Sequence, residues 1–145
     1  MRTAVVPLED IFELRRSVLR PGRPRNTAAF VEDGHPGVFH VAAYAPDGTL
    51  CACATFFPEQ LPGEAAPAHR LRGMASADAV RGQGYGAAVL QAGLAEARAR
   101  GAELVWCNGR VAARGFYEHQ GFTAVGEEFQ LEPAGAHYVF VAKLS

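Results

Sequence analysis

A glycine-rich segment, Arg81-Gly82-Gln83-Gly84-Tyr85-Gly86, is the part of the chain whose residue types best suit the binding of an anion. Glycines at alternate positions let the backbone approach a ligand closely. An alanine- and leucine-rich stretch typical of a helix follows, and the first turn of a helix carries N–H groups without partners inside it. No Ser, Thr, Asn or Asp stands next to Gly82 or Gln83 to cap that turn. The pattern predicts a phosphate or pyrophosphate site; the alternative is a flexible turn capped by water or by Asp78.

Two common phosphate-binding patterns do not fit this segment. A P-loop requires Gly-Lys-Ser/Thr, and the only lysine of the chain is Lys143. A dinucleotide-binding fold requires G-x-G-x-x-G after its first strand and an acidic residue at the end of the second. Here the glycine spacing is G-x-G-x-G, and Glu103 precedes its strand. The sequence therefore disfavours both a Walker-type NTPase and an NAD-binding module.

The rest of the chain predicts the elements that would position this segment. The expected strands cover residues 2–6, 38–45, 50–57, 69–75, 104–107, 122–131 and 138–144, and the expected helices cover 8–19, 84–100 and 111–120. Apolar residues at spacings of three and four support the first two helices, and Pro46-Asp47-Gly48-Thr49 suits the turn of a hairpin. Residues 20–37 are expected to be irregular, with one short helical turn near 28–31. The order of these elements predicts an α+β domain built on a mixed sheet.

Composition favours one globular domain that spans residues 1–145. The chain is 49% hydrophobic and carries a formal net charge of −1. This balance argues against a nucleic-acid or membrane surface held by bulk electrostatics. No apolar stretch approaches the length of a membrane-spanning helix, and the first ten residues do not resemble a signal peptide. We therefore expect a cytoplasmic protein without nucleic-acid or membrane partners.

The cysteines are expected to be small buried residues. Cys51, Cys53 and Cys107 are odd in number and contain no C-x-x-C pair, which argues against a disulfide framework and a four-cysteine zinc site. We expect no metal. The spacing of two predicts that Cys51 and Cys53 share one face of a strand.

From residue 69 to 126 the sequence resembles the GNAT superfamily of acyl-CoA-dependent N-acyltransferases, and the strand order extends this likeness over the whole chain. The matching features are Arg81, Gly84 and Gly86 of the pyrophosphate motif, the preceding strand Leu71 to Ser76, Asn108 after the next strand, and the helix-to-strand signature Phe116 to Phe122. Asp78 and Ser76 depart from the family, which often has proline and a β-branched residue there. The resemblance implies a mostly antiparallel sheet of six or seven strands, helices on both faces, and splayed strands before and after the glycine-rich loop.

The same resemblance implies acetyl-CoA as cosubstrate. Backbone N–H groups of the glycine-rich loop would hold its pyrophosphate, and the pantetheine arm would pair with the preceding strand, where an N–H group would polarise the thioester carbonyl. The implied binding residues are Met74, Ala75, Ser76, Arg81, Gly82, Gln83, Gly84, Tyr85, Gly86 and Asn108.

Tyr117 matches the family's tyrosine that protonates the departing thiolate, and the alternative is an aromatic residue that only packs against the sheet. No general base stands out, and Glu64, His69, His137 or a water chain are the candidates. The arginines between Arg15 and Arg25 either bind an acidic acceptor or form a solvated surface.

The resemblance thus implies an N-acetyltransferase that passes the acetyl group directly to a primary amine of a small molecule or peptide. Acylation of Cys107 would contradict direct transfer. The main alternative is a non-catalytic acyl-CoA-binding sensor or interaction module. The acceptor is not identifiable from the sequence, and a homodimer stays open.

Overall fold

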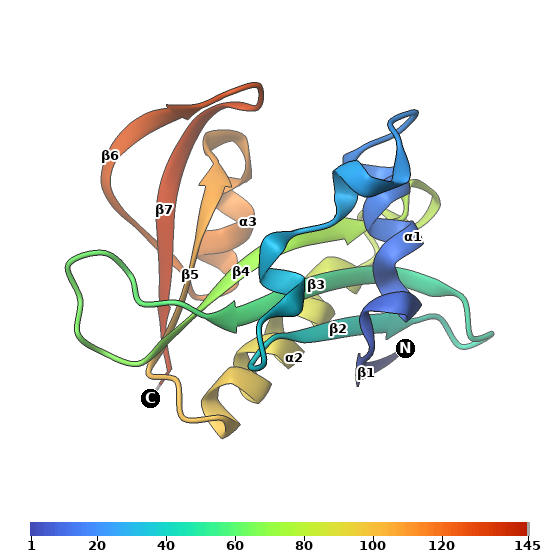
Figure 1. Cartoon of the computed structure of the whole chain (residues 1–145), viewed down its shortest axis with the longest axis horizontal. Helices are drawn as coiled ribbons and strands as arrows, with labels where there is room; N and C mark the ends of the chain where they lie inside the picture. The colour runs from blue at the N-terminus through green and yellow to red at the C-terminus, as the bar shows by residue number, and fades with distance from the viewer. Residues whose placement is uncertain (145) are drawn as a thin grey trace.

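Seven strands form one sheet in the computed structural model, which describes residues 1–144 (Figure 1). The strands are β1 (Arg2–Val6), β2 (Phe39–Tyr44), β3 (Leu50–Pro58), β4 (Ala68–Ser76), β5 (Leu104–Arg110), β6 (Thr123–Leu131) and β7 (Gly135–Lys143). Their order in the sheet is β1-β2-β3-β4-β5-β7-β6. Every neighbouring pair is antiparallel except β4 and β5, which are parallel. The predicted mixed, mostly antiparallel α+β sheet is confirmed.

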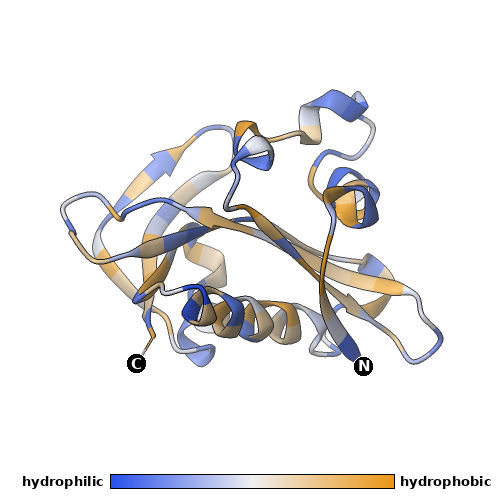
Figure 2. Ribbon diagram, turned by 60° about the horizontal axis from the view of Figure 1, so that its bottom comes forward, coloured by the Kyte–Doolittle hydropathy of each residue, from blue (hydrophilic) through white to orange (hydrophobic). Residues whose placement is uncertain are grey.

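Helices cover both faces of the sheet, as predicted. They are α1 (Leu8–Leu19), α2 (Tyr85–Ala99) and the short α3 (Arg114–His119). Figure 2 shows the sheet between α1 on one side and α2 on the other. Helix α1 buries Ile11 against the sheet with Leu8, Leu14 and Val18 around it, and α2 buries Val89, Leu90, Leu94 and Ala97. These apolar residues recur at the spacings of three and four from which the helices were predicted, so amphipathic periodicity positions both helices.

The core between α2 and the sheet is packed closely enough to require one glycine in the helix. Gly93 faces Phe56 of β3, and a methyl group on Gly93 would overlap the Phe56 ring. Phe56 is fully buried and stacks on Phe39 of β2, with ring centroids 5.1 Å apart. The glycine therefore lets α2 lie close to the strands that precede the glycine-rich loop.

Strands β4 and β5 separate soon after they pair. Their register contains only Ala68 to Arg70 opposite Leu104 to Trp106, and beyond these residues β5 turns away from β4 (Figure 1). On its other edge β4 has a bulge, because Cys53 pairs with Ala75 whereas Thr55 pairs with Arg72. This bulge holds Gly73 in a left-handed conformation with φ of +65°. The implied splay of the strands around the glycine-rich loop is confirmed.

Two local predictions from the sequence were wrong. The predicted turn near residues 28–31 is two 3₁₀ turns, Arg25–Ala28 and Val31–Gly34, on either side of that point. Cys51 and Cys53 do not share one face: Cys51 packs in the cluster under α2, and Cys53 packs with Ile11 under α1. The strand pairing slips at this point, since Ala43 pairs with Ala52 and the next residue, Tyr44, pairs with Leu50. The irregularity breaks the alternation of side chains on which the prediction relied. All three cysteines are free and buried, as predicted.

No helix among residues 1–144 is long and apolar enough to cross a membrane.

Candidate functional site

A cavity of about 910 Å³ opens where β4 and β5 separate. It is bordered by β4, the glycine-rich loop, the start of α2, β5 and α3, with Val18 and Leu19 of α1 at one side. Ten of the eleven residues implied by the resemblance line it: Met74, Ala75, Ser76, Arg81, Gly82, Gly84, Tyr85, Gly86, Asn108 and Tyr117. Gln83 is not part of the lining, and its side chain is exposed. The fold thus brings together residues that lie up to 43 positions apart in the sequence, from Met74 to Tyr117.

The start of α2 presents unpaired backbone donors to this cavity. Gly84 occupies the N-cap position with φ of +88°, and no side chain caps the helix. The first backbone bond into the helix runs from the Ala88 N–H to the Gly84 carbonyl, at 3.0 Å. The N–H groups of Tyr85, Gly86 and Ala87 precede that bond and have no acceptor among the described residues. These donors and the positive end of the helix dipole suit an anion.

Asp78 does not cap this helix. Its carboxylate accepts from Arg81 at 3.0 Å, and its side chain is 85% exposed. The alternative in which Asp78 satisfies the glycine-rich turn is therefore wrong, and Arg81 remains beside the free N–H groups.

The cavity-facing edge of β4 also carries free backbone groups. Because pairing with β5 stops at Arg70, the N–H and C=O groups of the following residues on that edge have no strand beside them. Leu71 to Ser76 border the cavity along this edge. Asn108 faces them from β5 and is half-buried. An extended ligand that carries amides could pair with β4 as an added strand would.

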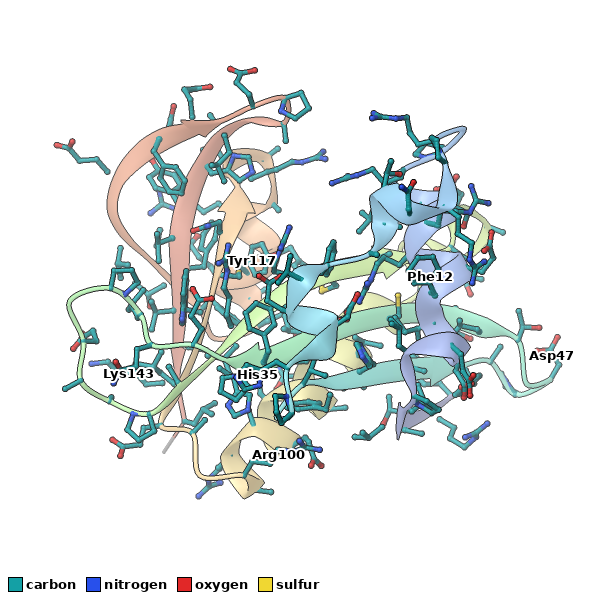
Figure 3. All side chains as sticks on the ribbon, viewed as in Figure 1. Phe12, His35, Asp47, Arg100, Tyr117 and Lys143 are labelled. Carbon is teal, nitrogen blue, oxygen red and sulfur yellow. The ribbon has the colours of Figure 1, made fainter. Side chains whose placement is uncertain are left out.

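Tyr117 lies at the wall of the cavity formed by α3 (Figure 3). Its ring stacks on Phe140 at 4.7 Å and meets the edge of Phe122 at 5.5 Å. Burial raises the pKa of the Tyr117 hydroxyl, and the neighbouring Cys107 thiol raises it further. The hydroxyl is therefore protonated at neutral pH and available as a proton donor.

Gly109 of β5, for which the sequence predicted no role, makes room for Tyr117. A Cβ on Gly109 would lie 2.7 Å from the rings of Tyr117 and Phe140. Cys107 beside it is 2% exposed, and burial raises the pKa of its thiol to about 12 although Tyr117 lowers it in part. Gly109 lies between Asn108 and Arg110, beyond the apolar run that predicted the strand, so no sequence pattern indicated this close approach.

The three candidates for a general base lie in different places. His137 of β7 lines the cavity. Glu64 is exposed on the β3–β4 loop. His69 is buried against Phe39, with ring centroids 5.7 Å apart, and borders a separate cavity of about 420 Å³. Burial lowers the pKa of the His69 imidazole. Of the three, only His137 lines the cavity that Tyr117 and the glycine-rich segment also border.

None of the arginines from Arg15 to Arg25 lines the cavity. Arg16 and Arg25 share the exposed carboxylate of Glu13, at 2.6 and 2.7 Å. Arg15 is fully buried instead, so neither interpretation of the cluster describes it. Three arginines line the cavity: Arg81 of the glycine-rich segment, and Arg72 and Arg110, for which the sequence predicted no role.

Arg15 is the centre of a buried polar network beneath the β4 bulge. Its guanidinium donates to both oxygens of Asp33, at 2.8 and 3.0 Å, to the Ala28 carbonyl at 3.1 Å, and to Thr55. Thr55 is also 2.8 Å from Nδ1 of His40. Burial raises the pKa of the Asp33 carboxyl, but the hydrogen bonds from Arg15 and the Phe30 N–H outweigh it and hold that pKa below its ordinary value.

This network fixes one wall of the site. The Phe30 ring lies between the guanidinium groups of Arg15 and Arg72, at 4.1 and 4.2 Å. A Cβ on Gly73 would lie 2.7 Å from Phe30. The bulge of β4 therefore packs against the Phe30 ring, which two guanidinium groups hold in place. This packing limits how far the strand edge can move.

A family model described as the acetyltransferase (GNAT) family matches residues 8–122. The chain belongs to the GNAT acetyltransferase family. It is 32% identical over 145 residues to the uncharacterized N-acetyltransferase YitI of Bacillus subtilis (strain 168), with 99% of this chain and 97% of that protein covered. The resemblance stated from the sequence is thereby confirmed.

Solved structures show the same GNAT fold. An acyl-CoA N-acyltransferase from Pseudomonas aeruginosa has a TM-score of 0.74 at 20% identity, with 97% of this chain and 98% of that chain covered. An aminoglycoside 6′-N-acetyltransferase complexed with coenzyme A has a TM-score of 0.76 at 15% identity, with 99% and 97% covered. At these identities the similarity establishes the fold, and the residues of this chain must carry any statement about its substrates.

Among residues 1–144 no group of three or more His, Cys, Asp and Glu side chains could hold a metal ion.

Proposed function

We propose that this GNAT protein transfers the acetyl group of acetyl-CoA directly to a primary amine of a small molecule or peptide. One observation carries the proposal: the free N–H groups at the start of α2 and the buried hydroxyl of Tyr117 border the same cavity. The first feature suits the pyrophosphate of coenzyme A, and the second suits protonation of its thiolate. Both are needed for turnover, and a site that only binds an anion has no use for the second.

Each part of the site would have a separate task. The N–H groups of Tyr85 to Ala87, with Arg81 beside them, would hold the pyrophosphate. The free edge of β4 would pair with the amides of the pantetheine arm and direct an N–H group at the thioester carbonyl, where negative charge develops. Tyr117 would stabilise the departing thiolate with a hydrogen bond and then give it a proton, because burial keeps the hydroxyl protonated while the thiolate forms beside it.

Transfer would be direct because Cys107 is a poor nucleophile. The thiolate is the reactive form of cysteine. A pKa of about 12 leaves the buried Cys107 thiol protonated at neutral pH. We therefore propose that the amine attacks the thioester without an acetyl-cysteine intermediate.

The three free thiols and the need for acetyl-CoA also support a cytoplasmic location.

The test measures release of the coenzyme A thiol in mixtures of acetyl-CoA with single amines. The panel contains an aminoglycoside, spermine, L-lysine and a peptide with a free N-terminus. We expect turnover with at least one amine and a fall in kcat of about 100-fold or more in Tyr117→Phe, with the Kd for acetyl-CoA unchanged. Tyr44→Phe, a change on β2 outside the cavity, is the matched control and should keep full activity.

Two results would overturn the proposal. Tight binding of acetyl-CoA without turnover of any amine or of water would favour the sensor. Stabilisation by NAD or ATP in preference to coenzyme A would favour a nucleotide-binding module.

A further inference from the structure

His137 of β7 is a buried histidine that borders the cavity and has one ring nitrogen engaged. The residue is 6% exposed. Its Nδ1 lies 2.7 Å from the carbonyl oxygen of Gly135. Its ring stacks on Phe129 of β6, with centroids 6.0 Å apart and planes inclined by 30°. The turn of the β6–β7 hairpin and the neighbouring strand therefore fix the orientation of the imidazole.

The contact with Gly135 decides which nitrogen carries the proton. A carbonyl oxygen can only accept a hydrogen bond, so Nδ1 must be the donor. In the neutral imidazole this leaves the lone pair on Nε2. Nε2 has no hydrogen-bond partner among the described residues. It is also absent from the few described side-chain atoms that are fully buried without a partner, so it keeps some exposure to solvent. Since His137 lines the cavity, Nε2 is an accessible acceptor there.

The strand register places His137 on the opposite face of the sheet from Tyr117. His137 pairs with Arg110 of β5, so both side chains project to the face that also carries Asn108. Cys107 pairs with Phe140, on which Tyr117 stacks, and these residues project to the other face. The cavity passes between β4 and β5 and is lined from both faces. A proton acceptor and a proton donor thus lie on the two sides of one opening.

We propose that Nε2 of His137 is the general base that takes a proton from the acceptor amine, an inference that rests on the proposed acetyl transfer. The amine nitrogen attacks the thioester carbonyl carbon and forms the C–N bond. One N–H proton passes to Nε2, and the C–S bond breaks with its electron pair on sulfur. The thiolate takes the Tyr117 proton. The imidazolium then loses its proton to solvent, and the tyrosinate regains one from solvent, so the products are the N-acetylated amine and coenzyme A.

The other ionisable groups around the opening do not suit this task. Arg72 and Arg110 are cations and cannot accept a proton. The Tyr117 hydroxyl is protonated because burial raises its pKa. On β6, Glu127 and Glu128 lie beside Phe129 in the chain and are exposed. Among the residues that line the cavity, His137 is therefore the one that offers an unengaged nitrogen lone pair.

His137→Asn is the most informative variant, because the asparagine amide can donate to Gly135 as Nδ1 does but has no basic nitrogen. His119→Gln on the exposed end of α3 is the matched control. Both are assayed from about pH 6 to pH 8 with the panel amine that gives the highest turnover, or with water as acceptor in acetyl-CoA hydrolysis. We expect kcat at neutral pH to fall at least about 100-fold in His137→Asn, with an unchanged Kd for acetyl-CoA. The pH profile of kcat in His137→Asn should differ from the wild-type profile, because the variant has no basic nitrogen at this position. His119→Gln should match wild type.

A second variant keeps the test decisive if His137→Asn folds poorly. His137→Ala opens space for free imidazole, and added imidazole should raise its kcat, whereas a purely structural role would leave kcat insensitive to the basicity of added imidazoles. A folded His137→Asn with wild-type kcat and pH profile would overturn the inference while leaving acetyl transfer intact. Absence of turnover in the wild-type protein would instead overturn the proposed function and this inference with it.

Discussion

Arg15→Met is expected to lower the free energy of unfolding by about 3–5 kcal/mol, the range found when one partner of a buried ion pair is removed. Arg15 is fully buried, and the Asp33 side chain that accepts from it is 8% exposed. The substitution would leave the Asp33 carboxylate, the Ala28 carbonyl and Thr55 without their shared donor. A chain of 145 residues gains about 0.3 kcal/mol/K of entropy on unfolding. The melting temperature should therefore fall by about 10–16 °C.

Urea and thermal unfolding followed by circular dichroism would measure this loss. Arg16→Met is the matched control: it breaks an exposed pair with Glu13 and should cost less than about 1 kcal/mol. In a double-mutant cycle, Asp33→Asn combined with Arg15→Met should be less destabilising than the sum of the single changes, because the second change removes the uncompensated charge. A loss under about 1 kcal/mol for Arg15→Met, or strict additivity, would refute the argument that this network holds Phe30 and the β4 bulge in place.

Three further outcomes are expected. Gly93→Ala should cost about 1–3 kcal/mol in urea unfolding because its methyl group would overlap Phe56; Gly115→Ala, which meets open space, should cost nothing, and equal effects would contradict the packing argument. Burial lowers the pKa of His40 below its ordinary 6.5, so the unfolded chain binds more protons and stability should fall as pH drops below about 7. The slope from this group is at most about 1.4 kcal/mol per pH unit, and an unchanged slope in His40→Gln would count against it. Intact-mass analysis after incubation with acetyl-CoA should show no acetyl adduct on Cys107, and an adduct would contradict direct transfer.

Periodicity and turn chemistry were sufficient to predict most of the fold. The helix at residues 8–19 and the strand at 2–6 agree with the structure at both ends. The helix predicted over 84–100 runs from Tyr85 to Ala99 and is followed by Gly101 with φ of +95°. In the two helices the apolar residues at spacings of three and four are the ones that pack against the sheet. The strand predicted over 104–107 extends to Arg110, because pairing with β7 continues through the less apolar residues Asn108 to Arg110.

The parts of the site that the sequence could not reveal depend on contacts between distant segments. No sequence pattern distinguished the three candidate general bases from one another. Only the pairing of β7 with β5 brings His137 to the cavity. Arg15 looked like one charge among several, yet its partners Asp33 and Thr55 lie 18 and 40 positions away. The glycine-rich segment was recognisable because its function depends on local backbone geometry. Side-chain roles that need tertiary neighbours leave no comparable local pattern.

Calorimetric titration of the ligand-free protein with acetyl-CoA tests most directly whether the start of α2 holds a pyrophosphate. Gly84 has a positive φ, and a Cβ there would meet no atom within 4 Å. Gly84→Asp and Gly84→Asn should strain the backbone about equally, but only aspartate adds negative charge beside the free N–H groups. We predict saturable one-site binding with a Kd on the order of micromolar, weakened at least about tenfold more by Gly84→Asp than by Gly84→Asn. No binding by the folded wild-type protein, or equal binding by the two variants, would contradict this function for the glycine-rich segment.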